Sequence, residues 1–368
     1  VYDKNKKPAV TISIGKQNFA GIWHESMKNF LNVRAMYKDI DIKSPKDNSS
    51  VRVSEAKIIS DLKDQAGLWS GPYQYVINGI EVNEKNNEVF KIKSLGITGS
   101  VSDFDPHAMG DYQEKISAMT ENFDGQSMNA ASGEQALGFY NFFTDSFSTL
   151  MDGFDARFAI QGLSIKGIKN DDLKSFNLDN ASYNIGMHGL KGNSMTFDLG
   201  FGYNGIDFTP KGANAESLPT EARYQMSFEN LPIQDLLDLG RSSISGYLQN
   251  PEMGQMMGMQ ALFTVPQLLT QAGTTVVVKN THIGNDNYSA TAEMQMFADM
   301  NAVKGAYGKG RVEVQGFDKM IELTNKALKD PELSPGNRQK LNDMRYLIFG
   351  FASPVPYTLQ KERPNMHM

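Results

Sequence analysis

Three short stretches of this sequence bring together side chains that could do chemistry. In "DFDPH", Asp103, Asp105 and His107 alternate along the chain. Carboxylates are ligands for hard divalent cations, so this stretch could form a metal site. The same residues around Pro106 also suit a loop that starts a helix, and nothing downstream supplies an obvious fourth ligand. We therefore expect a helix start here, with the metal site as the alternative.

A methionine cluster is the second candidate. The stretch "MGQMMGM" contains Met253, Met256, Met257 and Met259, and clustered thioethers can bind Cu(I). The whole chain has 20 methionines, however, and methionine is also a flexible filler of apolar surfaces. We interpret the cluster as an adaptable apolar face of a helix, with copper handling as the alternative.

The glycine-rich stretch "GFGYNG", Gly200 to Gly205, has the letters of a dinucleotide-binding fingerprint. That fingerprint requires a helix directly after it, whereas "IDFTPKG" is typical of a strand and a turn. No nucleophile-elbow motif occurs, and none of the five histidines forms a metal-binding pair on one helix turn. We therefore expect a non-enzymatic protein with no catalytic residues, no metal ligands and no cofactor.

The composition limits the class of protein and its partners. The chain has 368 residues, of which 40% are hydrophobic and 21% charged, as is usual for one large or two ordinary folded domains. The formal net charge is -6 and no long basic run occurs, so we expect no nucleic-acid partner. No apolar stretch approaches the roughly 20 residues that a spanning helix needs.

Two features fit a protein of the bacterial envelope. The sequence contains no cysteine, which excludes disulfides and thiolate chemistry and suits a compartment in which thiols are oxidised. The first residue is Val1 rather than methionine. We expect a processed or trimmed start, from which a signal peptide or a membrane anchor has been lost.

One pattern of apolar residues recurs along the chain. In "FAIQGLSI", Phe158 and Ile160 are two residues apart, as are Leu163 and Ile165, but a gap of three separates the pairs. The same spacing occurs in "YVINGIEV", "FKIKSLGI", "FGYNGIDF" and "MSFENLPI", and in weaker form in "AMYKDIDI" and "VVVKNTHI". A regular strand would place the two pairs on opposite faces.

A β-bulge in the gap would restore the facing of the second pair. The gaps hold residues that tolerate left-handed backbone angles, such as Asn78-Gly79, Gln161-Gly162 and Asn204-Gly205. All four apolar side chains then lie on one side, and the repeated bends would curl the sheet. The alternative is that Asn-Gly marks a tight hairpin turn, but the flanking arms are short for separate strands.

The patterns predict an α+β fold with a long curled antiparallel β-sheet, β-bulges and inserted helices. We expect β-rich segments over 1–105 and 156–231 and a third within 274–368, which ends in a helical pair over 318–329 and 337–350. Helical insertions are expected over 106–155 and 232–273, from stripes of apolar residues at helical spacing.

The predicted ligand contacts are the one-sided apolar residues of the central strands and the methionine-rich helix. They are Phe158, Ile160, Leu163, Ile165, Phe201, Tyr203, Phe228, Met256, Met259 and Phe263.

Three long stretches resemble bacterial periplasmic proteins of the YdgA type and the wider AsmA-like group. They are "ARFAIQGLSIKGI", "FNLDNASYNIGMHGL" and "ARYQMSFENLPIQDLL", and the resemblance extends over about residues 70–350. It implies β-rich segments with helical insertions, an upstream export signal or anchor, and a role in lipid or outer-membrane homeostasis. It implies no catalytic residues.

The leading hypothesis is a protein of the Gram-negative periplasm or cell envelope that binds a lipid or another hydrophobic molecule in a curled-sheet groove. Lipid transport or envelope homeostasis would be its role, and membrane association would come through the missing N-terminal anchor. The alternative is a structural or interaction module with a filled core, which docks an envelope protein or a second copy of itself.

Overall fold

The computed structural model describes residues 10–343, with gaps at 45, 47, 86, 122–132, 171–172, 210–215, 217, 303–304, 330–334, 337, 340–341. The second helix of the terminal pair, predicted over 337–350, lies outside the described residues for most of its length.

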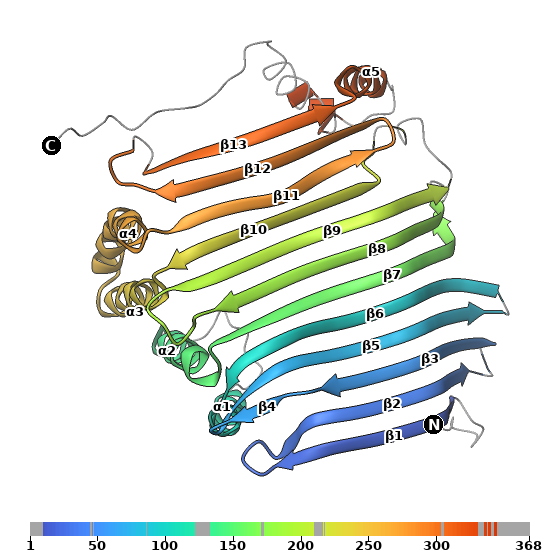
Figure 1. The fold of residues 1–368 in the computed structure, drawn as a ribbon, viewed down its shortest axis with the longest axis horizontal. Helices are drawn as coiled ribbons and strands as arrows, with labels where there is room; N and C mark the ends of the chain where they lie inside the picture. Colours follow the sequence, from blue (N-terminus) through green and yellow to red (C-terminus); the bar gives the residue numbers. More distant parts are fainter. Residues whose placement is uncertain are drawn as a thin grey trace.

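Thirteen strands of the described chain form one antiparallel sheet that runs from β1 at one edge to β13 at the other (Figure 1). Each long strand pairs with the next one along the sequence, and the short β4 pairs only with β5. The strands are β1 (Thr11–His24), β2 (Asn29–Ser44), β3 (Ser49–Ser60), β4 (Lys63–Gln65), β5 (Leu68–Glu84), β6 (Asn87–Phe104), β7 (Gly153–Asn170), β8 (Leu173–His188), β9 (Met195–Thr209), β10 (Glu221–Leu231), β11 (Thr275–Asn285), β12 (Tyr288–Ala298) and β13 (Ala306–Gln315).

The α+β class and the long antiparallel sheet are confirmed, but the expected strong curl is wrong. The sheet is open, with β1 and β13 as separate edges, and it is not strongly curled (Figure 1). The physical reason lies in the alignment of the bends. They fall on one line across neighbouring strands, so they crease the sheet along that line instead of winding it into a trough.

The crease is a row of residues without ladder partners. Gly162 of β7 faces Lys93 and Asp179 of its neighbours, yet the pairing register is the same on both sides of this row. The row continues through eight strands with Gly15, Asp39, Ser54, Gly79, Lys93, Gly162, Asp179 and Gly205. Every second member has positive φ: Asp39, Gly79, Gly162 and Gly205, with values between 54° and 69°.

The predicted bulges therefore have two outcomes. At Gly79, Gly162 and Gly205 no register shift occurs, because each neighbouring strand also has an unpaired residue at the same place in the ladder. True register shifts occur at Asn230 and Asn280, which also have positive φ. The hairpin alternative is wrong at Asn78-Gly79, Gln161-Gly162 and Asn204-Gly205, because all three pairs lie inside long strands.

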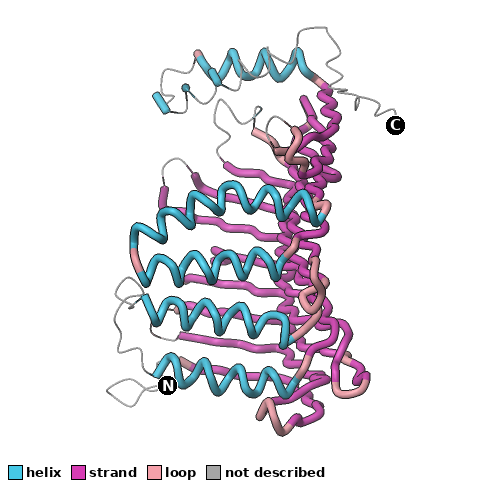
Figure 2. Tube along the Cα trace, turned by 90° about the vertical axis from the view of Figure 1, so that its left-hand side faces the viewer, coloured by secondary structure: helices cyan, strands magenta, loops and turns pink. Residues whose placement is uncertain are grey.

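Helices line one end of the strands. They are α1 (Pro106–Glu121) and α2 (Gly133–Leu150) between β6 and β7, and α3 (Ile233–Gln249) and α4 (Pro251–Ala272) between β10 and β11. The fifth helix, α5 (Phe317–Leu328), follows β13 at the opposite end of the strands (Figure 1). Figure 2 shows α1 to α4 stacked side by side, projecting from the sheet toward one side. The far parts of several strands extend toward that same side.

The helices pack on one another more than on the sheet. The rings of Tyr112 in α1 and Phe142 in α2 stack with centroids 4.8 Å apart. Between α2 and α3, the Tyr140 hydroxyl donates to the Leu237 carbonyl at 2.9 Å, and Arg241 Nη2 donates to Asp145 Oδ1 at 2.7 Å. The helices thus form a layer at the end of the sheet and leave both of its broad faces largely uncovered.

The buried core is correspondingly small. Only twelve hydrophobic residues of the described chain are buried, and most lie at the strand ends that meet the helices. Leu31, Phe104, Leu150 and Leu190 are each 4–8% exposed in this strip, and Pro106 is the largest side chain that is fully buried. A second, smaller site of burial is Leu323, Thr324 and Ala327 of α5.

Candidate functional site

A row of apolar side chains crosses the sheet at its middle. Its members are direct cross-strand partners on nine strands, from β1 to β10: Phe19, Ala35, Ile58, Tyr75, Ile97, Phe158, Tyr183, Phe201 and Tyr224. Six of these nine side chains are aromatic and exposed, with exposed fractions between 38% and 51%. Aromatic rings exposed at this density on one face are unusual for a soluble protein.

Adjacent rows on the same face are apolar too. A second row lies two residues along the strands from the middle row. From β2 to β13 it consists of Tyr37, Ala56, Ile77, Leu95, Ile160, Ala181, Tyr203, Ala222, Ile283, Ala290 and Val314. Successive side chains of a strand alternate between faces, so both rows lie on one side of the sheet. We call this surface the apolar face.

The apolar pattern continues beyond the crease. The first row there is Ile14, Ile40, Val53, Ile80, Ile92, Leu163, Leu178 and Ile206, and the next is Ile12, Ile42, Val51, Val82, Phe90, Ile165, Phe176 and Phe208. Each strand has two consecutive polar or glycine residues at the crease, such as Gln161-Gly162. We infer that this extra position keeps both pairs of rows on the apolar face.

Six of the seven predicted contacts on strands fall into these apolar rows, and Phe228 lies outside them. Phe158 and Phe201 are 44% and 47% exposed, and each belongs to the middle row. Ile160, Tyr203, Leu163 and Ile165 are half-buried members of the rows on either side. Phe228 pairs with Phe197 nearer the helices, where the two rings lie 6.1 Å apart.

Two tyrosines of the apolar face are partly desolvated. Burial raises the pKa of Tyr203. Burial also raises the pKa of Tyr73, and the neighbouring Tyr75 and Asp155 add to the effect. The Tyr73 hydroxyl lies over Gly99 and donates to the Asp155 carbonyl at 2.9 Å. These phenols stay neutral at physiological pH, so they add no charge to the surface.

The three predicted contacts on the methionine-rich helix form a separate patch. Met256, Met259 and Phe263 of α4 are 65%, 60% and 77% exposed and share one face of the helix, together with the neighbouring Leu262 at 72%. They do not belong to the rows of the sheet. The copper alternative for this cluster stays a prediction.

The "DFDPH" stretch forms a helix cap. Asp105 Oδ1 accepts the backbone amides of His107 and Ala108 at 2.8 and 3.2 Å, as the residue before a helix usually does. The His107 ring contacts the Ser26 hydroxyl instead of the carboxylates. No group of three or more residues able to hold a metal ion occurs among the described residues.

"GFGYNG" lies within β9, and its last residue, Gly205, belongs to the crease. No helix follows it directly in the described chain, so it lacks the geometry of a dinucleotide site. None of the described helices is both long enough and apolar enough to cross a bilayer.

Of the nine middle-row residues, only Phe158 and Phe201 were among the predicted contacts. Tyr183 sits in a less regular stretch, Phe19 belongs to a strand without a copy of the repeated pattern, and Tyr224 precedes the copy on its strand, "MSFENLPI". Each shows the simple alternation of an exposed strand, and this signal could have identified them. Their alignment with Phe158 depends on strand register, which only the structure supplies.

No family model matches the chain, and no curated protein or solved structure is significantly similar to it. The likeness to AsmA-like envelope proteins therefore remains a prediction from the sequence.

Proposed function

We propose that this chain is a non-enzymatic protein of the bacterial cell envelope that holds the acyl chains of lipids on its apolar face. The observation that carries the proposal is the middle row of exposed apolar side chains across nine strands. Exposing apolar surface to water costs a free energy of about 25 cal/mol per Å². Binding of a hydrophobic molecule that covers this surface is therefore favoured.

The dimensions and chemistry of the apolar face suit extended hydrocarbon. Eight strand-to-strand steps of about 4.8 Å give the middle row a length of roughly 38 Å. The side-chain groups of the middle row that can form hydrogen bonds are the hydroxyls of Tyr75, Tyr183 and Tyr224. Acyl chains need no directional partner, and each methylene that is covered contributes about 0.8 kcal/mol.

A curled groove is not required for this function. The helix layer projects from one end of the strands, and the far parts of the strands extend to that same side (Figure 2). This arrangement flanks an open surface and does not enclose a cavity. We therefore expect the apolar face to shield several chains loosely, as a lipid-handling protein would, and not to seal one chain tightly.

The test is the recovery of lipid from protein purified out of bacterial envelopes, measured by mass spectrometry of organic extracts. The double variant Tyr75→Ser, Phe158→Ser removes two rings of the middle row that lie on either side of Ile97 and are 46% and 44% exposed. At about 1 kcal/mol for each half-covered ring, we expect roughly thirty-fold weaker retention of lipid.

The matched control is Gln74→Ser with Thr98→Ser, which changes cross-strand partners on the opposite face of β5 and of β6, the strand between β5 and β7. It should retain lipid like the original chain. Equal retention by both double variants, or protein free of lipid from the start, would contradict the proposal.

A structural or interaction module is the second candidate, and the open edges of the sheet favour it. All ten residues of β13 are exposed, and β1 is exposed except at His24. Free strand edges can pair with another chain. If this candidate holds, a charged substitution on an edge strand, Val312→Lys, should abolish self-association in sedimentation experiments.

A further inference from the structure

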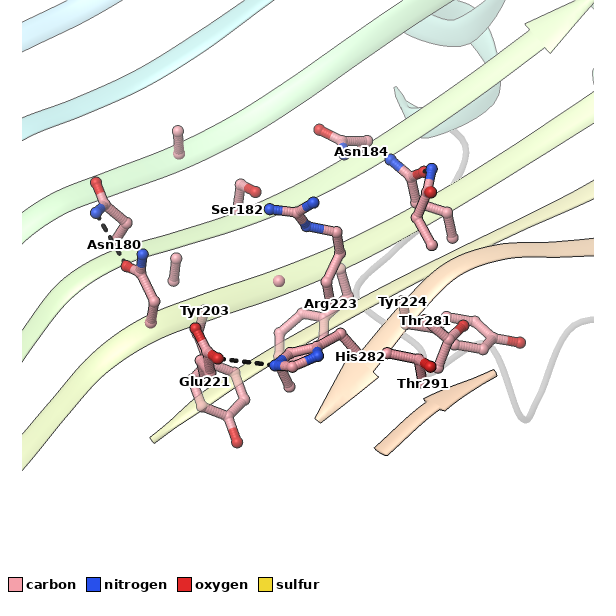
Figure 3. Close-up of a pocket in the computed structure, with 18 of the residues that line it drawn as sticks. Asn180, Ser182, Asn184, Tyr203, Glu221, Arg223, Tyr224, Thr281, His282 and Thr291 are labelled. Carbon is pink, nitrogen blue, oxygen red and sulfur yellow. Dashed lines mark hydrogen bonds and ion pairs between the residues drawn. The ribbon is translucent and has the colours of Figure 1, made fainter. Parts of the chain in front are cut away.

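A polar hollow lies on the face of the sheet opposite the apolar face (Figure 3). It has a volume of about 860 Å³ and is lined mainly by side chains of β7 to β12. Its central residues Ala159, Ser182 and Gly202 are the sequence neighbours of Phe158, Tyr183 and Phe201, so their side chains take the opposite direction.

Small residues create the hollow. Ala159, Ser182 and Gly202 are direct cross-strand partners on β7, β8 and β9, and the next residue of this row is Arg223 of β10. Figure 3 shows the Arg223 side chain extending across the sheet toward Ser182. In the adjacent row, Arg157 of β7 pairs with Asn184, which in turn pairs with Gly200.

The two arginines carry uncompensated charge. Neither Arg157 nor Arg223 forms an ion pair or a hydrogen bond with another described residue, and both are exposed. The acidic residues of the hollow lie toward β12 and β13 or are already engaged. Glu221 contacts His282 Nε2 at 2.7 Å, and Glu313 pairs with Arg311. The region over β7 to β10 is therefore cationic.

Amide and hydroxyl groups supply hydrogen bonds around this charge. Asn180 Nδ2 donates to Asn204 Oδ1 at 3.0 Å, and Asn280 Nδ2 donates to Gln225 Oε1 at 3.0 Å, which fixes two amide pairs at the rim. Asn184 Oδ1 is a buried atom with no hydrogen-bond partner among the described residues. Buried acceptors of this kind are costly unless a ligand donates to them.

From this arrangement we propose that the polar hollow binds an acidic saccharide. The guanidinium groups of Arg157 and Arg223 bind its carboxylate or phosphate, because arginine presents paired donors in the geometry of such anions. A sugar hydroxyl donates to Asn184 Oδ1. The volume lies within the range of roughly 300–1,000 Å³ that is usual for small-ligand sites. This site is independent of the lipid-binding proposal, because it lies on the other face.

Isothermal titration calorimetry on the full chain tests the site with digalacturonic acid, glucose 6-phosphate, glucose and inorganic phosphate. We expect saturable binding of the two acidic saccharides that weakens with added salt. Glucose should bind much more weakly because it lacks the anion, and phosphate because it lacks the hydroxyl array. Vesicles of phosphatidylcholine with and without glucuronosyl diacylglycerol distinguish a lipid-borne saccharide from a free one.

Arg157→Gln and Arg223→Gln should each weaken binding about tenfold to hundredfold, the usual loss for a hydrogen bond to a charged group. The matched control is Arg34→Gln. Arg34 lies on β2 in the same row as Arg157 and is exposed, but it does not line the hollow. Thermal unfolding checks that all three variants fold.

Several outcomes overturn the proposal. Absence of saturable binding does so, as does equal weakening by Arg34→Gln, which would indicate a general charge effect of the surface. Phosphate binding as tight as that of glucose 6-phosphate would indicate a simple anion site. None of these results bears on lipid retention, so failure here leaves the proposed function standing.

Discussion

Single glycines determine where the sheet bends. Gly162 has a φ of 61°, and a Cβ atom built on it would lie 2.8 Å from Lys93 Cβ. Gly79 and Gly205 make similarly close approaches to the side chains of Ser54 and Asp179. At each of these positions the chain needs both a left-handed backbone and the absence of a side chain.

Gly162→Ala separates these two requirements when it is compared with Gly167→Ala. Gly167 lies on the same strand with a φ of 67°, but a Cβ there would meet nothing within 4 Å. Both variants carry the backbone cost of about 1–2 kcal/mol, and only Gly162→Ala adds a steric clash. We expect the free energy of unfolding to fall further for Gly162→Ala, measured by denaturant titration. Equal losses would mean that the close packing at the crease contributes nothing.

The bend residues could be predicted from the sequence, because a preference for left-handed angles is a property of each residue and its neighbours. The polar hollow could not be predicted in this way. Ala159, Ser182 and Gly202 are unremarkable in their own strands and meet only because the registers of β7, β8 and β9 align them.

At the scale of elements, the helix layer depends on a few specific contacts. A Cβ atom on Gly240 of α3 would clash with the Tyr140 hydroxyl of α2, so this glycine allows the two helices to approach. The positions of α2, α3, α4 and α5 were predictable from apolar residues at helical spacing. The stacking of α2, α3 and α4 into a layer at the strand ends was not, since the same apolar stripes could have packed on the sheet.

Gly240→Ala should destabilise the chain in the presence of Tyr140 and stabilise it in a Tyr140→Ala background. In the second case the clash is absent, and alanine is favoured over glycine in a helix by about 1 kcal/mol. A double-mutant cycle by denaturant titration measures the difference. As a control, Gly138→Ala on α2, where a Cβ would meet nothing within 4 Å, should be neutral or stabilising in both backgrounds. If the effects of Gly240→Ala and Tyr140→Ala on the free energy of unfolding simply add, the two residues are not in contact.

At the scale of the whole molecule, stability must vary across the sheet. Each long strand is held by its two neighbours, and the two edge strands β1 and β13 have one neighbour each. The α+β class was predictable from the alternation of strand and helix patterns. The open shape was not, because curl depends on how the bends of separate strands line up.

Native-state hydrogen exchange should reveal this gradient. We expect the amides of β1 and β13 to exchange fastest, and those that pair β7 with β8 to exchange slowest, because opening the middle requires the loss of more ladder bonds. Mass spectrometry of peptides after exchange gives the rates. Uniform protection from edge to edge would show that the sheet unfolds as one cooperative unit.

The order of the strands also bears on how the chain is made. Nearly every strand pairs with the one just before it in sequence, and the longest segments between paired strands are the helical ones between β6 and β7 and between β10 and β11. Loops that close between near neighbours cost little entropy. A strand leaving the ribosome therefore finds its partner already in place. The protein can grow hairpin by hairpin during synthesis, without waiting for its C-terminal end.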